Sequence, residues 1–424
     1  MHYNILKNDT YSIASITRPR EQMVVLRIAI DIHTENTLRS QATACIYGEA
    51  LVSGCKNYSR DEFHEAISLL GSNIDVVVNN NIVNITIKST ATNAKKVFEI
   101  YTCMIISPTF QQREFPRIKK LLINELIQKK EEAATIAHER LVNQMYDTND
   151  RRYTYDTESL INEIQKVTRK DVLELHKKML RNYWFCTIGS NEKVLHLFNT
   201  MIQHSKVGIA ISKSAKKHTQ NKPRSKLLLH DVPSRENIEF SIGGPLQITL
   251  HHPDYLPFVF GLNVLGKWGG FTGRLMSTVR EKEGLTYGIY ARTETTTGTE
   301  FGYWRIMSFF APSKAAQGIQ STLRELKLIT TKGITDDEFR RFKVILTTQQ
   351  QLLSDSFERS VTELHAYHFA GFTLVEIEEF RNRLYNVSKK EVDTALKKYI
   401  DPTKLIISGS GPVKNVKKEL SKLL

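Results

Sequence analysis

The sequence predicts an α+β protein with two tandem homologous lobes, each a mainly antiparallel sheet with helices packed on one face. Its 424 residues exceed one ordinary core, because domains commonly hold about 100–200 residues. Short strand-like and longer helix-like apolar patterns alternate along the chain. The same short sequence signatures return in the same order about 220 residues later. Two copies of one α/β unit explain all three observations.

Apolar periodicity and turn residues predict the elements of the first half. Ser59 begins a helix, because Glu62 three residues later completes a capping-box pattern, and the helix stops at Gly71. The asparagines at residues 79–81 close a hairpin. In chain order, the expected elements are strands 11–16 and 24–32, helices 41–52 and 59–70, strands 74–78 and 82–87, and helices 92–106 and 112–130.

Matching segments in the second half indicate a tandem duplication of a unit about 210 residues long. The segment EFPRIK matches EFRRFK, and VTRKDV matches VSKKEV. Two glycine-containing pairs match as well. The matches are Glu114 with Glu338 (338 − 114 = 224), Val167 with Val387 (220), Gly189 with Gly409 (220), and Gly71 with Gly284 (213).

The boundary between the two copies is a stretch of changed composition. Residues 212–226 are rich in Lys and Ser and almost free of apolar residues, which is typical of an exposed linker. We therefore expect an N-terminal lobe at residues 1–211, a basic linker at 212–226 and a C-terminal lobe at 227–424.

Charge and composition narrow the classes of partner. The chain carries 59 Lys and Arg against 45 Asp and Glu, a formal net charge of +14, and 41% hydrophobic residues. This composition is that of a soluble globular protein, and the positive charge permits acidic partners. No apolar run approaches the roughly 18 residues that a membrane span needs, and no segment of signal-peptide type opens the chain. Because no basic motif is interleaved with aromatic residues, nucleic acid is not an expected partner.

The cysteines do not identify a compartment. The four residues, Cys45, Cys55, Cys103 and Cys186, have no paired close spacing. The spacing therefore predicts neither a disulfide framework nor a zinc knuckle.

The most informative stretch is residues 266–292. A glycine-rich turn opens into a helical run with apolar positions at 275, 276 and 279; the run ends at Gly284, and a strand starts at Tyr287. Arg280 and Tyr287 lie seven residues apart across the helix end. Both side chains can point into one space and offer donors to a carbonyl oxygen. The alternative is a capped helix in which the arginine makes a surface salt bridge and the tyrosine packs in a core.

The pattern G-G-x-x-x-R-L-x-x-x-V-R-E-K-x-G-L-x-Y in this stretch resembles the C-terminal half of the pitrilysin/insulinase-type zinc peptidases. The resemblance implies two pseudo-symmetric lobes, of which the first supplies metal ligands. It also implies that Arg280 and Tyr287 help to hold the substrate backbone near the metal.

The zinc motif of that family is absent. Catalytic members carry H-x-x-E-H on a helix of the first lobe, where two histidines on one helical face bind zinc and the glutamate acts as general base. Aligned here, the histidine positions hold Cys45 and Glu49, the base position holds Gly48, and the third ligand position holds Glu125. Neither H-x-x-E-H nor H-E-x-x-H occurs among the thirteen histidines. We expect no zinc or other cofactor on this chain, with Cys45 as a small buried hydrophobe and Glu125 as an ion-paired helix residue.

Other histidines are weaker candidates for a ligand site. His365 and His368 lie one helical turn apart and could share a ligand, although polar positions on an amphipathic helix explain them better. His251 and His252 are expected in a loop, and His138 lacks a second histidine at metal-binding spacing.

The resemblance implies a non-catalytic, substrate-positioning subunit of a heterodimeric zinc peptidase that encloses unfolded peptides. Zinc is then expected in a homologous partner subunit, and similar bacterial pairs suggest the periplasm. Pairing of the chain with itself is a further possibility. The alternative functions are a structural scaffold of the same fold, a chain active alone through other chemistry, and a peptide-binding module unrelated to proteolysis.

Overall fold

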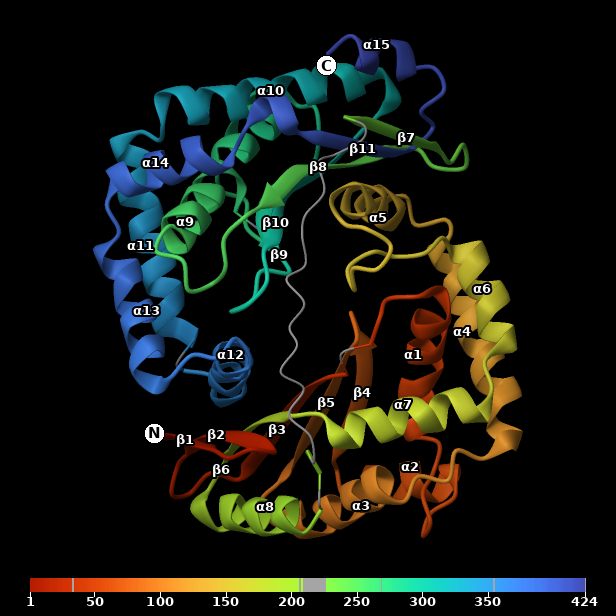
Figure 1. The fold of residues 1–424 in the computed structure, drawn as a ribbon. Helices are drawn as coiled ribbons and strands as arrows, with labels where there is room; N and C mark the ends of the chain where they lie inside the picture. Colours follow the sequence, from red (N-terminus) through yellow and green to blue (C-terminus); the bar gives the residue numbers. More distant parts are fainter. Residues whose placement is uncertain (33, 206, 209–225, 268, 354, 424) are drawn as a thin grey trace. The chain divides into compact units, whose positions relative to one another are not determined.

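The computed structural model describes residues 1–32, 34–205, 207–208, 226–267, 269–353 and 355–423 (Figure 1). The chain divides into two compact units. Unit 1 comprises Met1–Ile127, Tyr155–Ala215 and Leu352–Ile377, and unit 2 comprises Gln128–Thr154, Lys216–Gln351 and Glu378–Leu424. Residues 212–225 of the expected linker lie outside the described residues, and the boundaries at residues 211 and 227 remain a prediction.

Unit 1 contains a six-stranded sheet in the order β1-β2-β6-β3-β5-β4. All neighbouring strands are antiparallel except the parallel pair β2 and β6. The strands are β1 (His2–Lys7), β2 (Tyr11–Thr17), β3 (Met23–Asp31), β4 (Asn73–Asn79), β5 (Ile82–Thr90) and β6 (Trp184–Ser190). The helices are α1 (Leu38–Leu51), α2 (Arg60–Leu69), α3 (Ala94–Ile106), α4 (Phe115–Lys129), α6 (Thr157–Lys166), α7 (Arg169–Arg181), α8 (Glu192–His204) and α12 (Phe357–Phe369).

Local signals in the sequence determine where these elements begin and turn. The Ser59 side chain accepts from the Glu62 amide, and the Glu62 carboxylate accepts from the Ser59 amide, so the predicted capping box of α2 is confirmed. The hairpin of β4 and β5 turns at Asn80 and Asn81, which adopt φ values of 50° and 60°. Asparagine tolerates this left-handed conformation better than most residues.

The strand β3 shows how the sheet of unit 1 is covered on both faces. Val24, Leu26 and Ile28 alternate along β3 and belong to the main core. Arg27 lies on the other face and is paired in register with Thr187 of β6, whose hydroxyl contacts helix α12. A helix from the second half of the sequence therefore covers this face.

Unit 2 contains a five-stranded sheet in the order β7-β11-β8-β10-β9, with β7 and β11 parallel and the other neighbours antiparallel. The strands are β7 (Leu227–Asp231), β8 (Ile238–Leu246), β9 (Ile289–Glu294), β10 (Gly302–Phe310) and β11 (Ile406–Gly411). The helices are α5 (Ala133–Met145), α9 (Tyr255–Gly266), α10 (Ala315–Lys332), α11 (Asp336–Leu353), α14 (Lys389–Tyr399) and α15 (Lys417–Ser421), while α13 (Leu374–Asn386) runs from unit 1 into unit 2.

Helix α5 covers one face of the sheet in unit 2, as α12 does in unit 1. Leu141, Val142 and Met145 of α5 form a buried cluster with Tyr303 of β10 and Ile406 of β11. Each sheet is thus covered on one face by a helix from the opposite half of the sequence. The α+β class and the two-sheet architecture are confirmed, with this single helix added on the second face of each sheet.

One prediction about the cysteines is wrong. Cys55, between α1 and α2, forms a disulfide with Cys103 of α3, and their Cα atoms lie 5.8 Å apart. The two residues are separated by 48 positions in the sequence, so close spacing could not reveal the pair. The fold brings them together.

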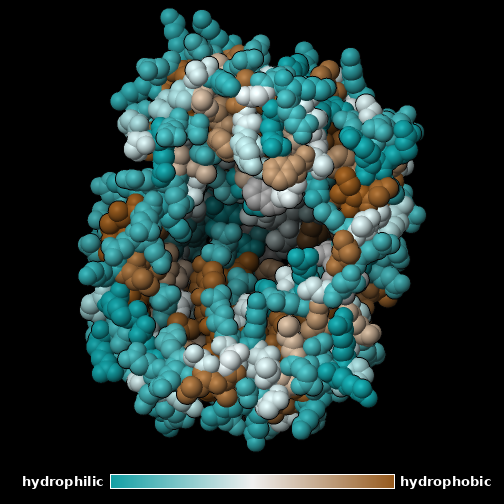
Figure 2. Space-filling view, turned by 180° about the vertical axis from the view of Figure 1, so that it is seen from behind, coloured by the Kyte–Doolittle hydropathy of each residue, from teal (hydrophilic) through white to brown (hydrophobic). Residues whose placement is uncertain are grey.

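The surface seen in Figure 2 is mostly hydrophilic, with separate hydrophobic patches. Large apolar side chains that are more than half exposed lie on different elements, including Leu69, Val344 and Val375. Within the described ranges, no helix has both the length and the apolar character needed to cross a membrane.

Candidate functional site

The candidate site begins at the glycine turn that follows α9. Gly269 and Gly273 have φ values of 69° and 120°, which side chains other than glycine rarely adopt. A Cβ atom on Gly273 would lie 2.9 Å from the Cα atom of Gly266, the last residue of α9. The turn therefore folds back tightly against the end of the helix, and only glycine fits at residue 273.

The turn leads into a short π-helix, Met276–Lys282. Leu275, Met276 and Val279 are fully buried in the core of unit 2, as the apolar pattern predicts. Gly284, with a φ of 62°, ends the helix at the predicted position. Short π-helical turns are rare and occur frequently at functional sites.

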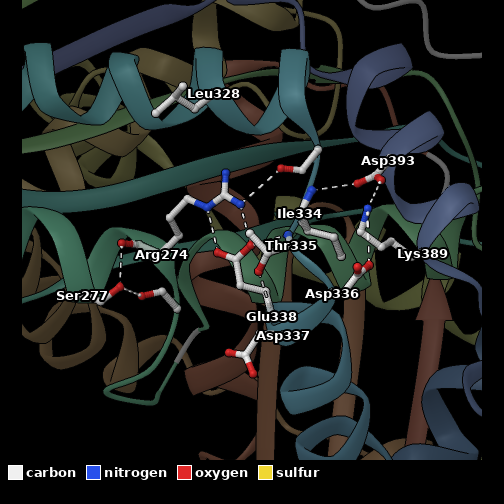
Figure 3. Close-up of polar contacts among 12 residues, drawn as sticks. Arg274, Ser277, Leu328, Ile334, Thr335, Asp336, Asp337, Glu338, Lys389 and Asp393 are labelled. Atoms are coloured by element: carbon white, nitrogen blue, oxygen red, sulfur yellow. Dashed lines mark hydrogen bonds and ion pairs between the residues drawn. The ribbon is translucent and has the colours of Figure 1, made fainter.

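Arg274 ties the start of this helix to α11 (Figure 3). Its guanidinium donates to both carboxylate oxygens of Glu338, with Nε–Oε1 at 2.8 Å and Nη2–Oε2 at 2.5 Å, and to the Gly333 carbonyl at 3.2 Å. Glu338 also forms a capping box with Thr335 at the beginning of α11. Burial raises the pKa of Glu338, but the bonds from Arg274 and Thr335 outweigh it and lower the pKa below its ordinary value.

The beginning of α11 is also held to α14, as Figure 3 shows. The backbone amide of Ile334 donates to Asp393 at 2.8 Å, and Lys389 lies 3.2 Å from the second oxygen of the same carboxylate. Arg274 is therefore anchored to a segment that is itself fixed.

Glu283 holds the other end of the π-helix. Its carboxylate accepts hydrogen bonds from the Ser321 hydroxyl and from Arg324, each at 2.5 Å, and both residues lie on α10. The π-helix is consequently braced at one end to α11 and at the other to α10.

Arg280, on this braced helix, contacts two aromatic rings. Its Cζ atom is 4.8 Å from the ring centroid of Phe271 and 5.1 Å from that of Tyr287. The two rings are 6.5 Å apart and nearly perpendicular, and 58% of Phe271 and 66% of Tyr287 are exposed. We call these three residues the aromatic clamp. The sequence-predicted pair is brought together, and a stacked guanidinium is the geometry expected of a cation–π contact.

The polar atoms of the clamp remain available for a ligand. Among the described residues, no carboxylate pairs with Arg280, and the Tyr287 hydroxyl has no hydrogen-bond partner. The surface salt bridge and the buried tyrosine of the alternative interpretation are therefore not what this part of the structure shows. Arg274, six residues before Arg280 in the same motif, is instead the arginine with a structural ion pair.

Two features of the clamp differ from the sequence prediction. The strand β9 starts at Ile289, so Tyr287 lies in the preceding loop. The Thr286 hydroxyl accepts from the Gly288 amide at 3.2 Å, and such local bonds compete with a strand ladder. Phe271 was missed by sequence analysis, although an aromatic residue inside a glycine turn is a visible signal.

The degenerate metal positions of α1 do not form a site. Cys45 is partly buried against the core of unit 1, as expected of a small hydrophobe. Gly48 is buried, and a Cβ atom there would lie 3.0 Å from the carbonyl oxygen of Val76 in β4. A side chain at residue 48 would therefore begin in tight contact with the strand backbone. Glu49 remains partly exposed at the end of α1.

Glu125 does not complete a ligand set either. It lies on the exposed side of α4, and the ion pair predicted for it is not formed with any described residue. Across the described ranges, no three His, Cys, Asp or Glu side chains converge in a way that could hold a metal ion. The donor set present on α1 and α4 does not fit a zinc ion of the family's type.

Of the other candidate histidines, three contact hydroxyl groups and two lie in a loop. His365 and His368 point into unit 1, where each Nδ1 lies within hydrogen-bonding distance of the Thr187 hydroxyl, at 3.0 and 3.2 Å. The interpretation of this pair as ordinary polar positions of an amphipathic helix is wrong, because the helix presents them to the sheet. His138 contacts the Tyr303 hydroxyl at 2.6 Å, and burial lowers the pKa of His138 to about 4. His251 and His252 lie in a loop as predicted.

The sequence matches known peptidase-family regions over more than half of its length. Residues 13–158 match the family described as insulinase (peptidase family M16), and residues 166–346 match the peptidase M16 inactive domain. A curated relative, the Non-peptidase homolog YmxG of Helicobacter pylori, is 21% identical over 363 residues, which cover 84% of this chain and 82% of that protein.

Solved structures share the fold over almost the whole chain. The peptidase M16 inactive domain from Pseudomonas fluorescens has a TM-score of 0.84 at 18% identity, covering 97% of this chain and 98% of that one. A protease from Helicobacter pylori has a TM-score of 0.81 at 12% identity, covering 96% and 99%. Three observations indicate the same family: the shared fold, the two matched regions in their order along the chain, and the glycine–arginine–tyrosine motif. This chain belongs to the M16 (insulinase) family of peptidases.

Proposed function

We propose that this chain has no peptidase activity of its own and serves as the peptide-positioning subunit of a heterodimeric zinc peptidase. The aromatic clamp is the observation that carries the proposal. The Arg280 guanidinium has no carboxylate partner in the described chain and contacts two exposed rings. The π-helix that carries Arg280 is braced at both ends. Arg280 and Tyr287 would then hold a peptide carbonyl, and a homologous partner with H-x-x-E-H would supply zinc and the general base.

The bracing explains how the clamp would act on a peptide. Fixed donors lose little conformational freedom when a carbonyl binds, so they stabilise the developing charge on its oxygen effectively. The clamp's exposed rings provide apolar surface for the neighbouring peptide side chains. An extended peptide exposes its backbone carbonyls and the neighbouring side chains together, so unfolded peptide is the proposed substrate.

The residues at the metal-site positions of the first lobe support the proposal that this chain positions the peptide while a partner supplies zinc and the general base. Gly48 has no side chain to take a proton from water, and the carbonyl of Val76 limits what could replace it. The name of the Helicobacter pylori relative, a non-peptidase homolog, agrees with the proposal. An oxidising compartment such as the periplasm is part of the proposal, because the Cys55–Cys103 disulfide persists under such conditions.

Reconstitution of the pair tests this function. The full chain is produced together with the homologous H-x-x-E-H chain from the same genome, and cleavage of an unfolded peptide is measured for the pair and for each chain alone. We expect cleavage by the pair only, and a fall in kcat/KM of about 100-fold with Arg280→Ala, similar to the loss of a donor that stabilises an oxyanion. The matched control is Arg340→Ala, since Arg340 is 73% exposed and lies 3.9 Å from Asp337.

Two results would contradict the proposal. Unchanged cleavage with Arg280→Ala would show that the clamp does not contribute to the site and would support a scaffold role. Chelator-sensitive cleavage by the purified chain alone would show that it holds a working metal centre.

A further inference from the structure

The aromatic clamp lies in surroundings with surplus positive charge. The Lys267 ammonium folds back over the glycine turn, 3.4 Å from where a Cβ atom of Gly270 would be. No carboxylate among the described residues pairs with Lys267 or with Arg280. The carboxylate of Glu283 is already bound by Ser321 and Arg324, while Glu281 is exposed and forms no ion pair with Arg280 in the described part of the chain.

This charge favours a carboxylate over a neutral carbonyl as the ligand. A guanidinium presents parallel N–H donors that match the two oxygens of a carboxylate, and such charge-assisted pairs are about twice as strong as neutral hydrogen bonds. Tyr287 contributes a hydroxyl donor to the same cluster, since its ring centroid lies 5.1 Å from the Arg280 Cζ atom.

The rings add a requirement for an apolar group close to the carboxylate. Phe271 and Tyr287 are both more than half exposed, their ring centroids are 6.5 Å apart, and both rings contact the Arg280 guanidinium. A side chain that covers them must begin within a few bonds of the carboxylate that Arg280 binds. The last residue of a peptide has both groups on one carbon atom, whereas the side chain of an internal Asp or Glu has no apolar group of its own.

Building on the function proposed above, we infer that the aromatic clamp binds the free C-terminal carboxylate of a peptide that ends in a large apolar residue. Arg280 and Tyr287 bind the carboxylate, and Phe271 together with the Tyr287 ring contacts the terminal side chain. The clamp then selects peptide ends, for example those left by an earlier endoproteolytic cut.

Calorimetric titration of the purified full chain tests this inference. Three short unfolded peptides are compared: one ending in Phe with a free carboxylate, the same peptide with a C-terminal amide, and the amide form with an internal Glu. We expect the free acid to bind at least about tenfold more tightly than the other two. High salt should reduce this preference, because an exposed ion pair is screened. Arg280→Ala should abolish the preference, and Arg340→Ala should leave it unchanged.

The role of Phe271 has its own readout. With Phe271→Ser, the preference for a terminal Phe over a terminal Ser should decrease, while the preference for acid over amide should persist. The matched control is Tyr385→Ser, since Tyr385 is a 40% exposed aromatic residue on α13.

Each other outcome overturns the inference in a recognisable way. Equal binding of acid and amide, both weakened by Arg280→Ala, would exclude a carboxylate site and leave the proposed positioning function intact. Equal binding of the free acid and the internal-Glu peptide would exclude selection of C-termini. Absence of binding by all three peptides would overturn the carboxylate site, and the reconstituted pair would then decide the proposed function separately.

Discussion

Gly48 of α1 faces the carbonyl oxygen of Val76 in β4 so closely that a Cβ atom on residue 48 would lie 3.0 Å from that oxygen. Gly48 is the residue that the sequence resemblance aligns with the general base of the catalytic family members, and this contact leaves little room for a side chain there. The absence of the zinc motif is therefore accompanied by tight packing of α1 against β4 at this residue.

Restoring the motif should not restore a metal site. We expect Cys45→His combined with Gly48→Glu and Glu49→His to lower the free energy of unfolding by about 1–3 kcal/mol, because the new side chain at residue 48 overpacks against β4. Zinc titration and thermal unfolding measure the outcome. Gly48→Ala alone is the control for the steric effect, and stoichiometric zinc with chelator-sensitive cleavage would contradict the prediction.

The two arginines of the motif should separate stability from binding. Arg274→Ala leaves Glu338 without its bidentate partner in a site where both side chains are less than 15% exposed, so we expect a loss of about 3 kcal/mol in the free energy of unfolding at pH 7. Arg280→Ala should change stability by about 1 kcal/mol or less, because its side chain has no ion pair in the described chain and its cation–π contacts are with exposed rings. Urea unfolding of both variants checks this contrast.

The effect of Arg274→Ala should also depend on pH. Arg274 helps to lower the pKa of Glu338 below 4.5, so its stabilising contribution is present above that pH and is lost as the pH falls through the folded-state pKa. The stability difference between wild type and variant should therefore narrow in acid. A constant difference from neutral pH to pH 3 would contradict the assigned ion pair.

The buried histidines of α12 should make the fold sensitive to mild acid. Burial lowers the pKa of His365 to about 3 and that of His368 to about 4, from an ordinary value of 6.5. Below pH 6.5 the unfolded chain binds protons that the folded chain does not, so each histidine reduces the free energy of unfolding by up to about 1.4 kcal/mol for each pH unit until the folded-state pKa is reached. Denaturant unfolding from pH 7 to pH 5 measures this slope.

Matched variants identify the source of that pH dependence. Replacing both residues with Gln should flatten the slope, whereas His196→Gln on the exposed side of α8 should not. An unchanged slope in the double variant would mean that α12 does not bury these imidazoles against Thr187.

The disulfide should contribute to stability and report on compartment. Cys55 and Cys103 close a loop of 48 residues, for which chain entropy predicts a contribution of roughly 4 kcal/mol. Reductant should lower the Tm of the oxidised protein and leave the Cys55→Ser/Cys103→Ser variant unaffected. Protein that has been secreted into an oxidising compartment should show two titratable thiols when it is unfolded without reductant. Four titratable thiols would exclude the disulfide.

The sequence alone determined features that depend on contacts between neighbouring residues, or on whether a motif is present in the chain. The Ser59–Glu62 capping box and the end of the π-helix at Gly284 follow from contacts within one or two turns of chain. The repeated signatures, the glycine–arginine–tyrosine motif that led to the family and the absence of H-x-x-E-H are all visible without coordinates. These signals are local, so they persist whatever the path of the chain.

Tertiary structure decided which distant residues meet. The exchange of α5 and α12 between the sheets, the disulfide across 48 positions and the contact of Gly48 with Val76 each depend on the course of the whole chain. The same holds for the two arginines: Arg274 and Arg280 are chemically identical in the sequence, and only packing places one against Glu338 and the other against two exposed rings. Long-range contacts are selected by the collective burial of apolar surface, which no short segment encodes by itself.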